Sequence, residues 1–271
     1  VQDIIMMRKK PMLAYPVSSK PIDYNNTVFM QPKLDGVRCV IQCEQHMNYL
    51  NNEIVAYSRT GKEWKNIDHI LEQLRPFFDK YPNVILDGEL YNHDLKDDFE
   101  QIISCVRKTK PTDEHRAQSK ELVQFHCYDI VDEAMPFVDR IHWLRKNLAP
   151  FPYGVRLVAT ESVLDEKDSE LYHKLCLEQG YEGSILRLND VYQCKRSHNL
   201  RKFKDFHDAE AVITDWVEGK GKRKGTIGKF MAIDADGNTF GMPVMDNFKK
   251  LQTMFKEMQS WVGKEATFTY F

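Results

Sequence analysis

Lys33-Leu34-Asp35-Gly36-Val37-Arg38 is the most informative stretch of this sequence. It places an amine, a carboxylate, a glycine and a guanidinium within six residues. The residues that follow alternate between apolar and polar, which predicts a half-buried strand with Arg38 pointing away from the core. Lys33 would then lie at the mouth of that strand. There a lysine can attack an electrophile, once burial or a nearby cation lowers its pKa. A surface lysine and arginine around a glycine turn is the alternative.

Length and composition indicate an ordinary globular protein. The chain has 271 residues, of which 42% are hydrophobic and 29% are charged, so a large core and a second small domain are expected. No run of 18 apolar residues occurs, so neither a membrane span nor secretion is expected. The six cysteines form no C-x-x-C pair, which favours reduced, buried thiols in a cytosolic protein over a zinc site. A net charge of −2 means that a nucleic-acid partner would need a local basic patch.

The order of apolar patterns predicts a mixed α+β protein. Residues 1–24 look irregular, and residues 107–121 read as a charged loop. A helix beginning at Asn66 is expected to kink or restart at Pro76. The remaining expected strands are 27–44, 54–58, 84–86, 122–131, 155–159, 184–188 and 197–205, and the expected helices are 99–106, 136–144 and 165–179.

Candidate binding residues follow several of these strands. Asp87-Gly88-Glu89 and Glu182-Gly183 each place a carboxylate beside a glycine at a sheet end, where ligands collect. A solvated turn is the equal alternative for Asp87-Gly88-Glu89. Tyr128 lies on the face opposite the core residues of its strand, so its ring either stacks on a ligand or packs against the next element. Lys202 and Lys204 share a face if residues 197–205 form a strand.

The pattern changes after Asp205, which predicts two domains, 1–205 and 206–271. Short strands are expected at 209–217, 228–234, 239–242 and 266–270, with a helix over 247–259. Such a series of short strands suits a small barrel of the oligonucleotide-binding (OB) fold with an inserted helix.

Six motifs, each at the end of an element, resemble those of ATP-dependent DNA ligases. They are Lys33-x-Asp-Gly-x-Arg, Ser58-Arg59-Thr60-Gly61, Asp87-Gly88-Glu89, Tyr128-Asp129, Glu182-Gly183 and Lys202-x-Lys204. Pro11-Met12-Leu13-Ala14 is also similar to the ligase leader. The compact plan resembles bacteriophage and viral ligases, within the covalent nucleotidyltransferase superfamily. The resemblance implies an adenylation domain of antiparallel sheets with flanking helices, followed by a C-terminal OB-fold barrel.

This resemblance implies a role for each motif. Lys33 would attack the α-phosphate of ATP to form lysyl–AMP; AMP would pass to the 5′-phosphate of a nick, and the 3′-hydroxyl would displace it. Mg²⁺ is implied as a second cofactor. The other roles implied are Gln31, Pro32 and the backbone before Lys33 at the adenine edge, Tyr128 on the adenine face, Glu89 at the ribose or a metal, Glu182 at a metal, Arg38 and Arg59 at nucleotide and nick phosphates, and Lys202 and Lys204 at the α-phosphate.

The expected partner is nicked double-stranded DNA, bound by a monomer. Residues 195–229 contain ten Lys or Arg and five Asp or Glu, and Lys222, Arg223 and Lys224 read as a flexible loop that meets phosphates. A solubilising loop is the alternative. Ligases usually end with a further basic motif, and none follows Lys264 in this sequence. Either the C-terminal domain lacks its end here, or the first step is supported in another way.

Two other functions compete with nick sealing. An RNA ligase or an mRNA-capping guanylyltransferase shares the lysyl–nucleotide chemistry, although Gln31, residues 58–61 and the leader favour the DNA enzyme. A noncatalytic nick-binding module would use only the barrel and the basic stretch. The expected location is the cytoplasm, or the host cytoplasm if the protein is viral.

Overall fold

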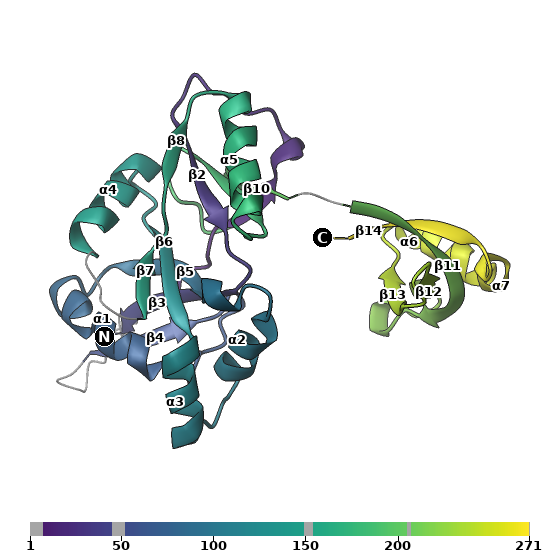
Figure 1. Cartoon of the computed structure of the whole chain (residues 1–271), viewed down its shortest axis with the longest axis horizontal. Coiled ribbons are helices and arrows are strands. Elements are labelled where there is room, and N and C mark those ends of the chain that lie inside the picture. Colours follow the sequence, from purple (N-terminus) through teal and green to yellow (C-terminus); the bar gives the residue numbers. More distant parts are fainter. Residues whose placement is uncertain (1–7, 45–51, 149–153, 205–206, 271) are drawn as a thin grey trace, which may run out of the picture. The chain divides into compact units, whose positions relative to one another are not determined.

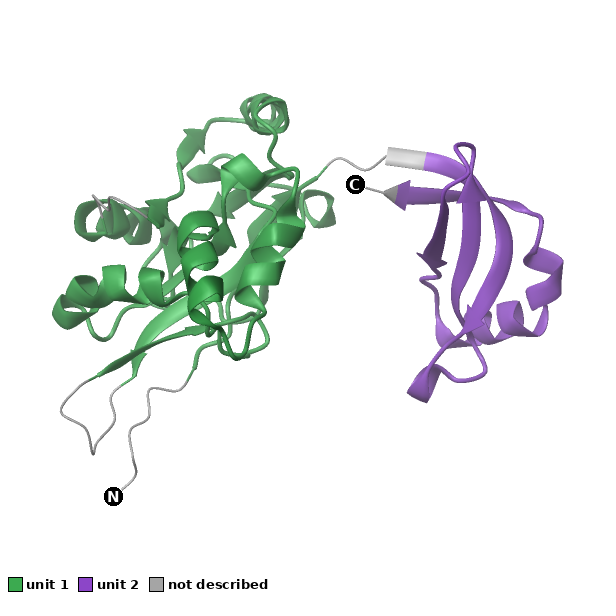
Figure 2. Cartoon of the chain, turned by 60° about the horizontal axis from the view of Figure 1, so that its bottom comes forward, with its two compact units in different colours: residues 1–204 green, residues 205–271 purple. Residues whose placement is uncertain are grey.

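The computed structural model describes residues 8–44, 52–148, 154–204 and 207–270. The chain divides into two compact units, residues 1–204 and 205–271 (Figures 1 and 2). The boundary expected after Asp205 falls on residues outside the described part. Sheets with flanking helices make up unit 1, so the α+β prediction is confirmed.

The first sheet of unit 1 has five strands in the order β4-β3-β5-β6-β7. All neighbours are antiparallel except β6 and β7. In β6, buried and half-buried residues alternate, and Tyr128 is on the half-buried side, as its strand pattern predicts. The strands are β3 (Val37–Glu44), β4 (Glu53–Tyr57), β5 (Ile85–Tyr91), β6 (Gln124–Ile130) and β7 (Val155–Leu157).

The second sheet of unit 1 has the order β1-β10-β9-β2-β8. The leader was expected to be irregular, but residues 13–16 form an edge strand parallel to β10. Main-chain hydrogen bonds to β10 outweigh the weak strand pattern of this proline-flanked segment. The strands are β1 (Leu13–Pro16), β2 (Val28–Lys33), β8 (Glu161–Val163), β9 (Gly183–Leu188) and β10 (Arg196–Phe203).

The helices of unit 1 cover these sheets. Helix α1 packs against β4, α4 against β6, and α5 against β9 and β2. In the described part of the chain, no helix combines the length and apolarity needed to cross a membrane. The bounds are α1 (Asp68–Lys80), α2 (Phe99–Val106), α3 (Asp113–Leu122), α4 (Phe137–Asn147) and α5 (Glu166–Glu178), with single turns η1 (Val17–Ser19) and η2 (His93–Leu95).

Of two predictions about helices, the structure narrows one and contradicts the other. Helix α1 runs through Pro76, which excludes a restart but not a kink; Pro76 and Glu72 are both exposed, so water can satisfy the carbonyl that the proline cannot bond. The expected loop at 107–121 contains α3. Its first turn is fixed by a capping box in which the Thr112 hydroxyl accepts from the His115 N–H and the Thr112 N–H donates to the His115 ring.

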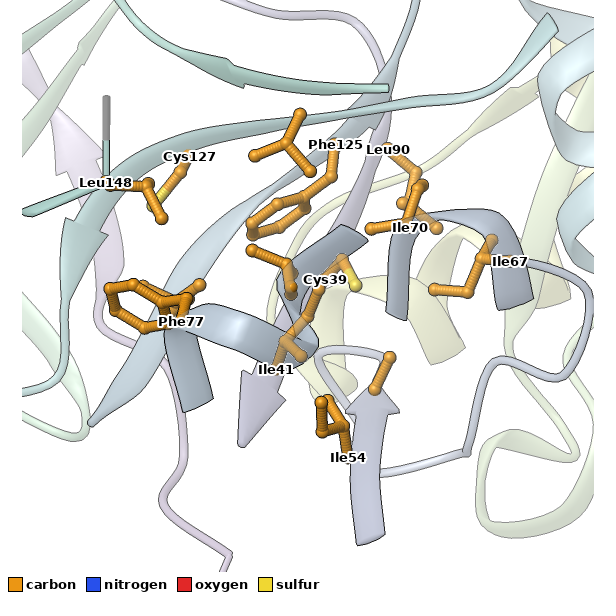
Figure 3. Packing of buried hydrophobic residues seen from close by; sticks show 14 of the residues in the cluster. Cys39, Ile41, Ile54, Ile67, Ile70, Phe77, Leu90, Phe125, Cys127 and Leu148 are labelled. Atoms are coloured by element: carbon orange, nitrogen blue, oxygen red, sulfur yellow. The ribbon is translucent and has the colours of Figure 1, made fainter. Parts of the chain in front are cut away.

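The main hydrophobic core lies between the first sheet and α1 (Figure 3). Buried residues of α1 recur at helical spacing, and among them Ile70 and Phe77 face the sheet residues Cys39, Ile41 and Phe125. All six cysteines are free thiols, and five of them are buried.

Unit 2 is a curled antiparallel sheet in the order β13-β12-β11-β14. Its edge strands share no pairing among the described residues, so the expected closed barrel is not shown. Nevertheless, the rings of Phe240 and Phe268, from opposite edges, have centroids only 4.6 Å apart. The elements are β11 (His207–Glu218), η3 (Gly221–Arg223), β12 (Ile227–Asp234), β13 (Thr239–Pro243), α6 (Phe248–Lys256), α7 (Met258–Trp261) and β14 (Glu265–Tyr270), with α6 against β12.

Candidate active site

A cavity of about 540 Å³ in unit 1 brings most of the candidate residues together. Strands of both sheets contribute to its wall, together with the turn after β4. This volume lies within the range of small-molecule and cofactor sites. The candidate residues that line it are Gln31, Pro32, Lys33, Arg38, Arg59, Glu89, Tyr128 and Lys202.

Lys33 lies at the end of β2 and contacts a carboxylate that it shares with another lysine. Its amine contacts Oε2 of Glu182, and the amine of Lys204 contacts Oε1 of the same side chain. The three side chains are between 12% and 20% exposed. Burial lowers the pKa of Lys33, and Glu89 and Asp35 partly oppose this shift. Burial thus shifts the amine toward the neutral form that a nucleophile needs, while the nearby carboxylates act in the opposite direction.

The backbone at Lys33 is held by a glycine. Lys33 pairs with Gly183 across β2 and β9, so the residue before Gly183, Glu182, is brought next to the amine. Gly183 has φ of 151°, and a Cβ added there would lie 2.2 Å from the carbonyl oxygen of Phe203. Any larger residue would push β9 away from β10, because backbone would have to move.

Glu89 and Tyr128 form the wall of the cavity on the first sheet. The Tyr128 hydroxyl donates to Oε2 of Glu89 at 3.2 Å. Burial raises the pKa of Glu89 to about 7, although Arg38 and Lys33 oppose the shift. Gly36 leaves room for this carboxylate, because a Cβ at position 36 would lie 2.7 Å from Cγ of Glu89. The glycine of the hexapeptide is therefore needed for close approach of two chain segments.

Arg38 forms an ion pair inside the protein. Its Nε and Nη2 donate to the two oxygens of Asp87, both at 2.6 Å, and Nη2 also donates to the Met12 carbonyl at 3.0 Å. The Tyr192 hydroxyl donates to Asp87 at 2.7 Å and accepts from the Met12 N–H. The resemblance to ligases implies phosphate binding for Arg38. In the structure most of its donors already have partners, although the side chain still lines the cavity.

Gln31 is held in the same way. Its amide nitrogen donates to the Tyr128 carbonyl at 3.1 Å and to the Thr160 hydroxyl at 2.8 Å, and its oxygen accepts from Arg187 at 2.6 Å. The side chain is 1% exposed. These bonds leave the backbone of residues 31–33, rather than the Gln31 amide, as the part able to meet a ligand.

Asp87 and Asp129 belong to the sequence motifs, but sequence reasoning did not predict that they form the buried ion pairs that support the cavity wall. Asp129 accepts from Arg140 Nε at 2.7 Å and from Arg187 Nη1 at 2.7 Å, and all three residues are at most 3% exposed. Asp87 is also fully buried. A carboxylate inside or directly after an apolar strand was the available signal, because such a charge requires a partner. Arg140 and Arg187 carried no such signal in the sequence, because they lie on different elements from Asp129. Arg107 also lines the cavity.

The remaining candidates lie apart from the Lys33 group. Arg59 is exposed in the turn after β4, at the rim of the cavity. Lys222, Arg223 and Lys224 are exposed at and after η3 in unit 2, where the Gly225 N–H donates to Glu218. These three residues therefore belong to a different compact unit from Lys33.

The donors near Lys33 suit a hard cation that is held mostly by a ligand and water. The described residues contain no cluster of three or more His, Cys, Asp or Glu. Mg²⁺ commonly binds through one or two carboxylates plus phosphates and waters, and Glu89 and Glu182 supply two carboxylates near Lys33. A cation would also favour the ionised form of Glu89.

Relatives of this chain are known. African swine fever virus DNA ligase is 32% identical over 211 residues, which are 73% of this chain and 46% of that ligase. The chain thus spans about half the length of these curated viral relatives. The Haemophilus influenzae DNA ligase is 22% identical over 220 residues, covering 80% of this chain and 71% of that protein.

Solved structures share the fold. A Lig E DNA ligase superposes with a TM-score of 0.74 at 22% identity, covering 97% of this chain and 93% of its own. The bacteriophage T7 ATP-dependent DNA ligase complexed with ATP gives 0.56 at 15% identity, covering 97% and 93%. The family model described as the ATP dependent DNA ligase domain matches residues 11–204, from the leader to Lys204. This chain therefore belongs to the ATP-dependent DNA ligase family.

Proposed function

We propose that the protein seals nicks in double-stranded DNA through a lysyl–AMP intermediate on Lys33. The observation that carries this proposal is the position of Lys33, which lies in the wall of the cavity with Glu182 and Lys204 around its amine. Burial lowers the pKa of this amine, which suits a nucleophile. A lysine with a purely structural role would have no reason to lie beside a cavity.

The first step forms a bond between Nζ of Lys33 and the α-phosphorus of ATP and breaks the bond to the β-phosphate oxygen, so pyrophosphate leaves. The proton lost from the amine passes to Oε2 of Glu182, which contacts it. Lys202 and Lys204 offset the negative charge that develops on the α-phosphate. Phosphoryl-type transfer depends mainly on such positioning and electrostatics.

In the later steps, a 5′-phosphate oxygen of the nick takes AMP from Lys33, and the amine recovers its proton. The 3′-hydroxyl then attacks the same 5′-phosphorus and gives up its proton to water, the bond from that phosphorus to the AMP phosphate oxygen breaks, and AMP leaves. Mg²⁺, which Glu89 and Glu182 would hold, supplies charge neutralisation at the phosphates when bound. Tyr128 and the backbone of residues 31–33 would orient the adenine, and Arg38 and Arg59 would meet phosphates.

The proposed partner is nicked duplex DNA, bound by a monomer whose Lys222, Arg223 and Lys224 neutralise phosphates. The exposure of these three residues supports this role. The OB-type role of unit 2 is supported by its curled sheet, in which Phe240 meets Phe268. We also infer a cytoplasmic location, because six free thiols persist in a reducing compartment.

Transfer of label from ATP tests the proposal. We expect α-labelled ATP with Mg²⁺ to give an acid-labile AMP adduct that is lost in Lys33→Ala and kept in Lys146→Ala, which removes an exposed lysine of α4. Addition of nicked DNA should discharge the adduct and yield sealed product. No adduct combined with tight nick binding would contradict the proposal and indicate a binding module. A GMP adduct from labelled GTP would instead indicate a capping enzyme, and sealing of RNA alone an RNA ligase.

A further inference from the structure

We infer that His173, on helix α5, is a positioning residue that fixes Glu182 and Lys204 around Lys33; this inference rests on the function proposed above. His173 is buried, with 5% of its surface exposed, and lies behind the wall that carries Lys33 rather than in the cavity lining. It contacts the two strands that lead to these charged residues.

The imidazole holds both strands at neighbouring positions. Nδ1 of His173 shares a hydrogen bond of 3.0 Å with the Ser184 hydroxyl of β9. The same ring stacks on Phe203 of β10, with centroids 4.3 Å apart and an angle of 25° between the planes. Ser184 and Phe203 are themselves paired across the two strands. One side chain of α5 therefore contacts both residues of a single cross-strand pair, Ser184 and Phe203, a pair called here the rung.

That rung lies directly beside the reacting group. Glu182 is two residues before Ser184, and Lys204 follows Phe203. Gly183 lies between Glu182 and Ser184 and pairs with Lys33. A Cβ at Gly183 would be 3.2 Å from Cε1 of His173, so the ring packs closely over this backbone.

The geometry has a consequence for the shared carboxylate. Glu182 contacts Lys33 through one oxygen and Lys204 through the other, so its position depends on the spacing of β9 and β10 at their ends. The stack on Phe203 and the bond to Ser184 fix that spacing. Without them, Glu182 and Lys204 would separate by small displacements, and a misplacement of about 1 Å can lower a rate about a hundredfold.

A matched pair of serine variants tests the inference in the full-length protein. Ser184→Ala removes the hydroxyl that bonds His173, and Ser169→Ala removes an equally buried hydroxyl of α5, which bonds the Tyr24 hydroxyl instead. Ser169→Ala also removes the bond that this hydroxyl donates to the Asp165 carbonyl, so it should destabilise the protein at least as much as Ser184→Ala. Only Ser184→Ala should slow lysyl–AMP formation in a single turnover.

His173→Ala and His173→Phe complete the series. We expect His173→Ala to slow adenylylation per folded molecule by about ten- to a hundredfold. The ATP concentration for half-maximal rate should stay near the parent value, because the residues lining the cavity are unchanged. His173→Phe keeps a ring against Phe203 and should recover part of the rate.

Two results would overturn the inference. One is a His173→Ala protein that is adenylylated as fast per folded molecule as the parent. The other, decisive if His173→Ala does not fold, is an equal rate for Ser184→Ala and Ser169→Ala. Failure of the proposed function is distinguishable from both, because the parent protein itself would then form no AMP adduct.

Discussion

The environment of a single residue, Glu89, disfavours the ionised form of its carboxylate. It lies beside the cavity, and burial raises its pKa to about 7 although Arg38 and Lys33 are close. The ordinary pKa of a glutamate is near 4.5. The folded protein therefore holds the Glu89 proton more tightly than the unfolded chain does, and ionisation of this residue opposes folding.

We expect Glu89→Gln to become more stable relative to the parent as pH rises. Below about pH 4.5 the carboxyl is protonated in folded and unfolded chains alike, so the variant gains nothing. Between that pH and about 7 the parent loses stability, because the carboxyl ionises in the unfolded chain while the buried group still holds its proton. Above about 7 the carboxyl is ionised in both states, and the difference should level off. Thermal unfolding from pH 4.5 to 8 measures this, with Glu170→Gln on the exposed side of α5 as the control for loss of a carboxylate. A difference that does not vary with pH would contradict the expectation.

Sequence patterns predicted which residues line the site better than they predicted the contacts that each of these residues makes. Lys33, Glu89 and Tyr128 line one cavity, but only Lys33 lies at the end of its strand. The expectation that Asp87-Gly88-Glu89 follow a short strand was wrong, because β5 runs on to Tyr91 in register with β3 and β6. The hexapeptide could not show that Arg38 pairs with Asp87, because that contact depends on how β3 and β5 pair. Likewise, the bonds of Gln31 come from three other elements.

At the scale of elements, buried ion pairs join the two sheets of unit 1. Asp129 at the end of β6 accepts from Arg187 of β9 and from Arg140 of α4. Arg187 also holds Gln31 on β2, next to Lys33 in the same strand. The wall of the cavity therefore depends on a charge cluster from which water is largely excluded.

Asp129→Asn should strongly destabilise unit 1. It leaves two buried guanidinium groups without their counter-charge, and breaking one buried pair typically costs about 3–5 kcal/mol. Glu133→Gln is the control, because it breaks an ion pair with Lys9 in which both side chains are exposed, Lys9 by 47% and Glu133 by 50%. An exposed pair contributes far less to stability than a buried one. Denaturant unfolding compares the two. Similar free energies of unfolding for both variants would show that the buried cluster contributes little.

Long apolar patterns predicted elements well, and local chemistry explains the failures. Helix α2 was expected at its observed bounds, because Phe99, Ile102, Ile103 and Val106 follow a helical period. Helix α3 was missed because Ser119 is its only buried residue, so it has no apolar stripe. Its signal was the N-cap Thr112 followed by acidic residues in the first turn.

For the whole molecule, the division into two units separates the proposed chemistry from the proposed contact with DNA. Lys33 and the cavity belong to unit 1, whereas Lys222, Arg223 and Lys224 belong to unit 2. Composition predicted the change in character near residue 205. It could not predict how far the small sheet closes, because closure depends on contacts between edge strands such as that of Phe240 with Phe268.

Replacing Lys222, Arg223 and Lys224 by alanine should weaken nick binding and flatten its dependence on salt. For every DNA phosphate that is no longer neutralised, the slope of log K against log salt concentration should fall by about 0.9. Lysyl–AMP formation in the absence of DNA should be unaffected. Replacing Lys249, Lys250 and Lys256 of α6 removes the same charge and serves as the control. An equal slope in the two triple variants would exclude the loop from the interface.

Lys204 has a double place in this protein, as a member of the charge group at Glu182 and as the last residue of unit 1. One peptide bond thus separates an ammonium beside the nucleophile from the start of the second unit. In the proposed mechanism, the chain therefore leaves unit 1 directly beside a charge that neighbours the attacking amine. An insertion right after Lys204 would then act on the chemistry of unit 1 as well as on its connection to unit 2.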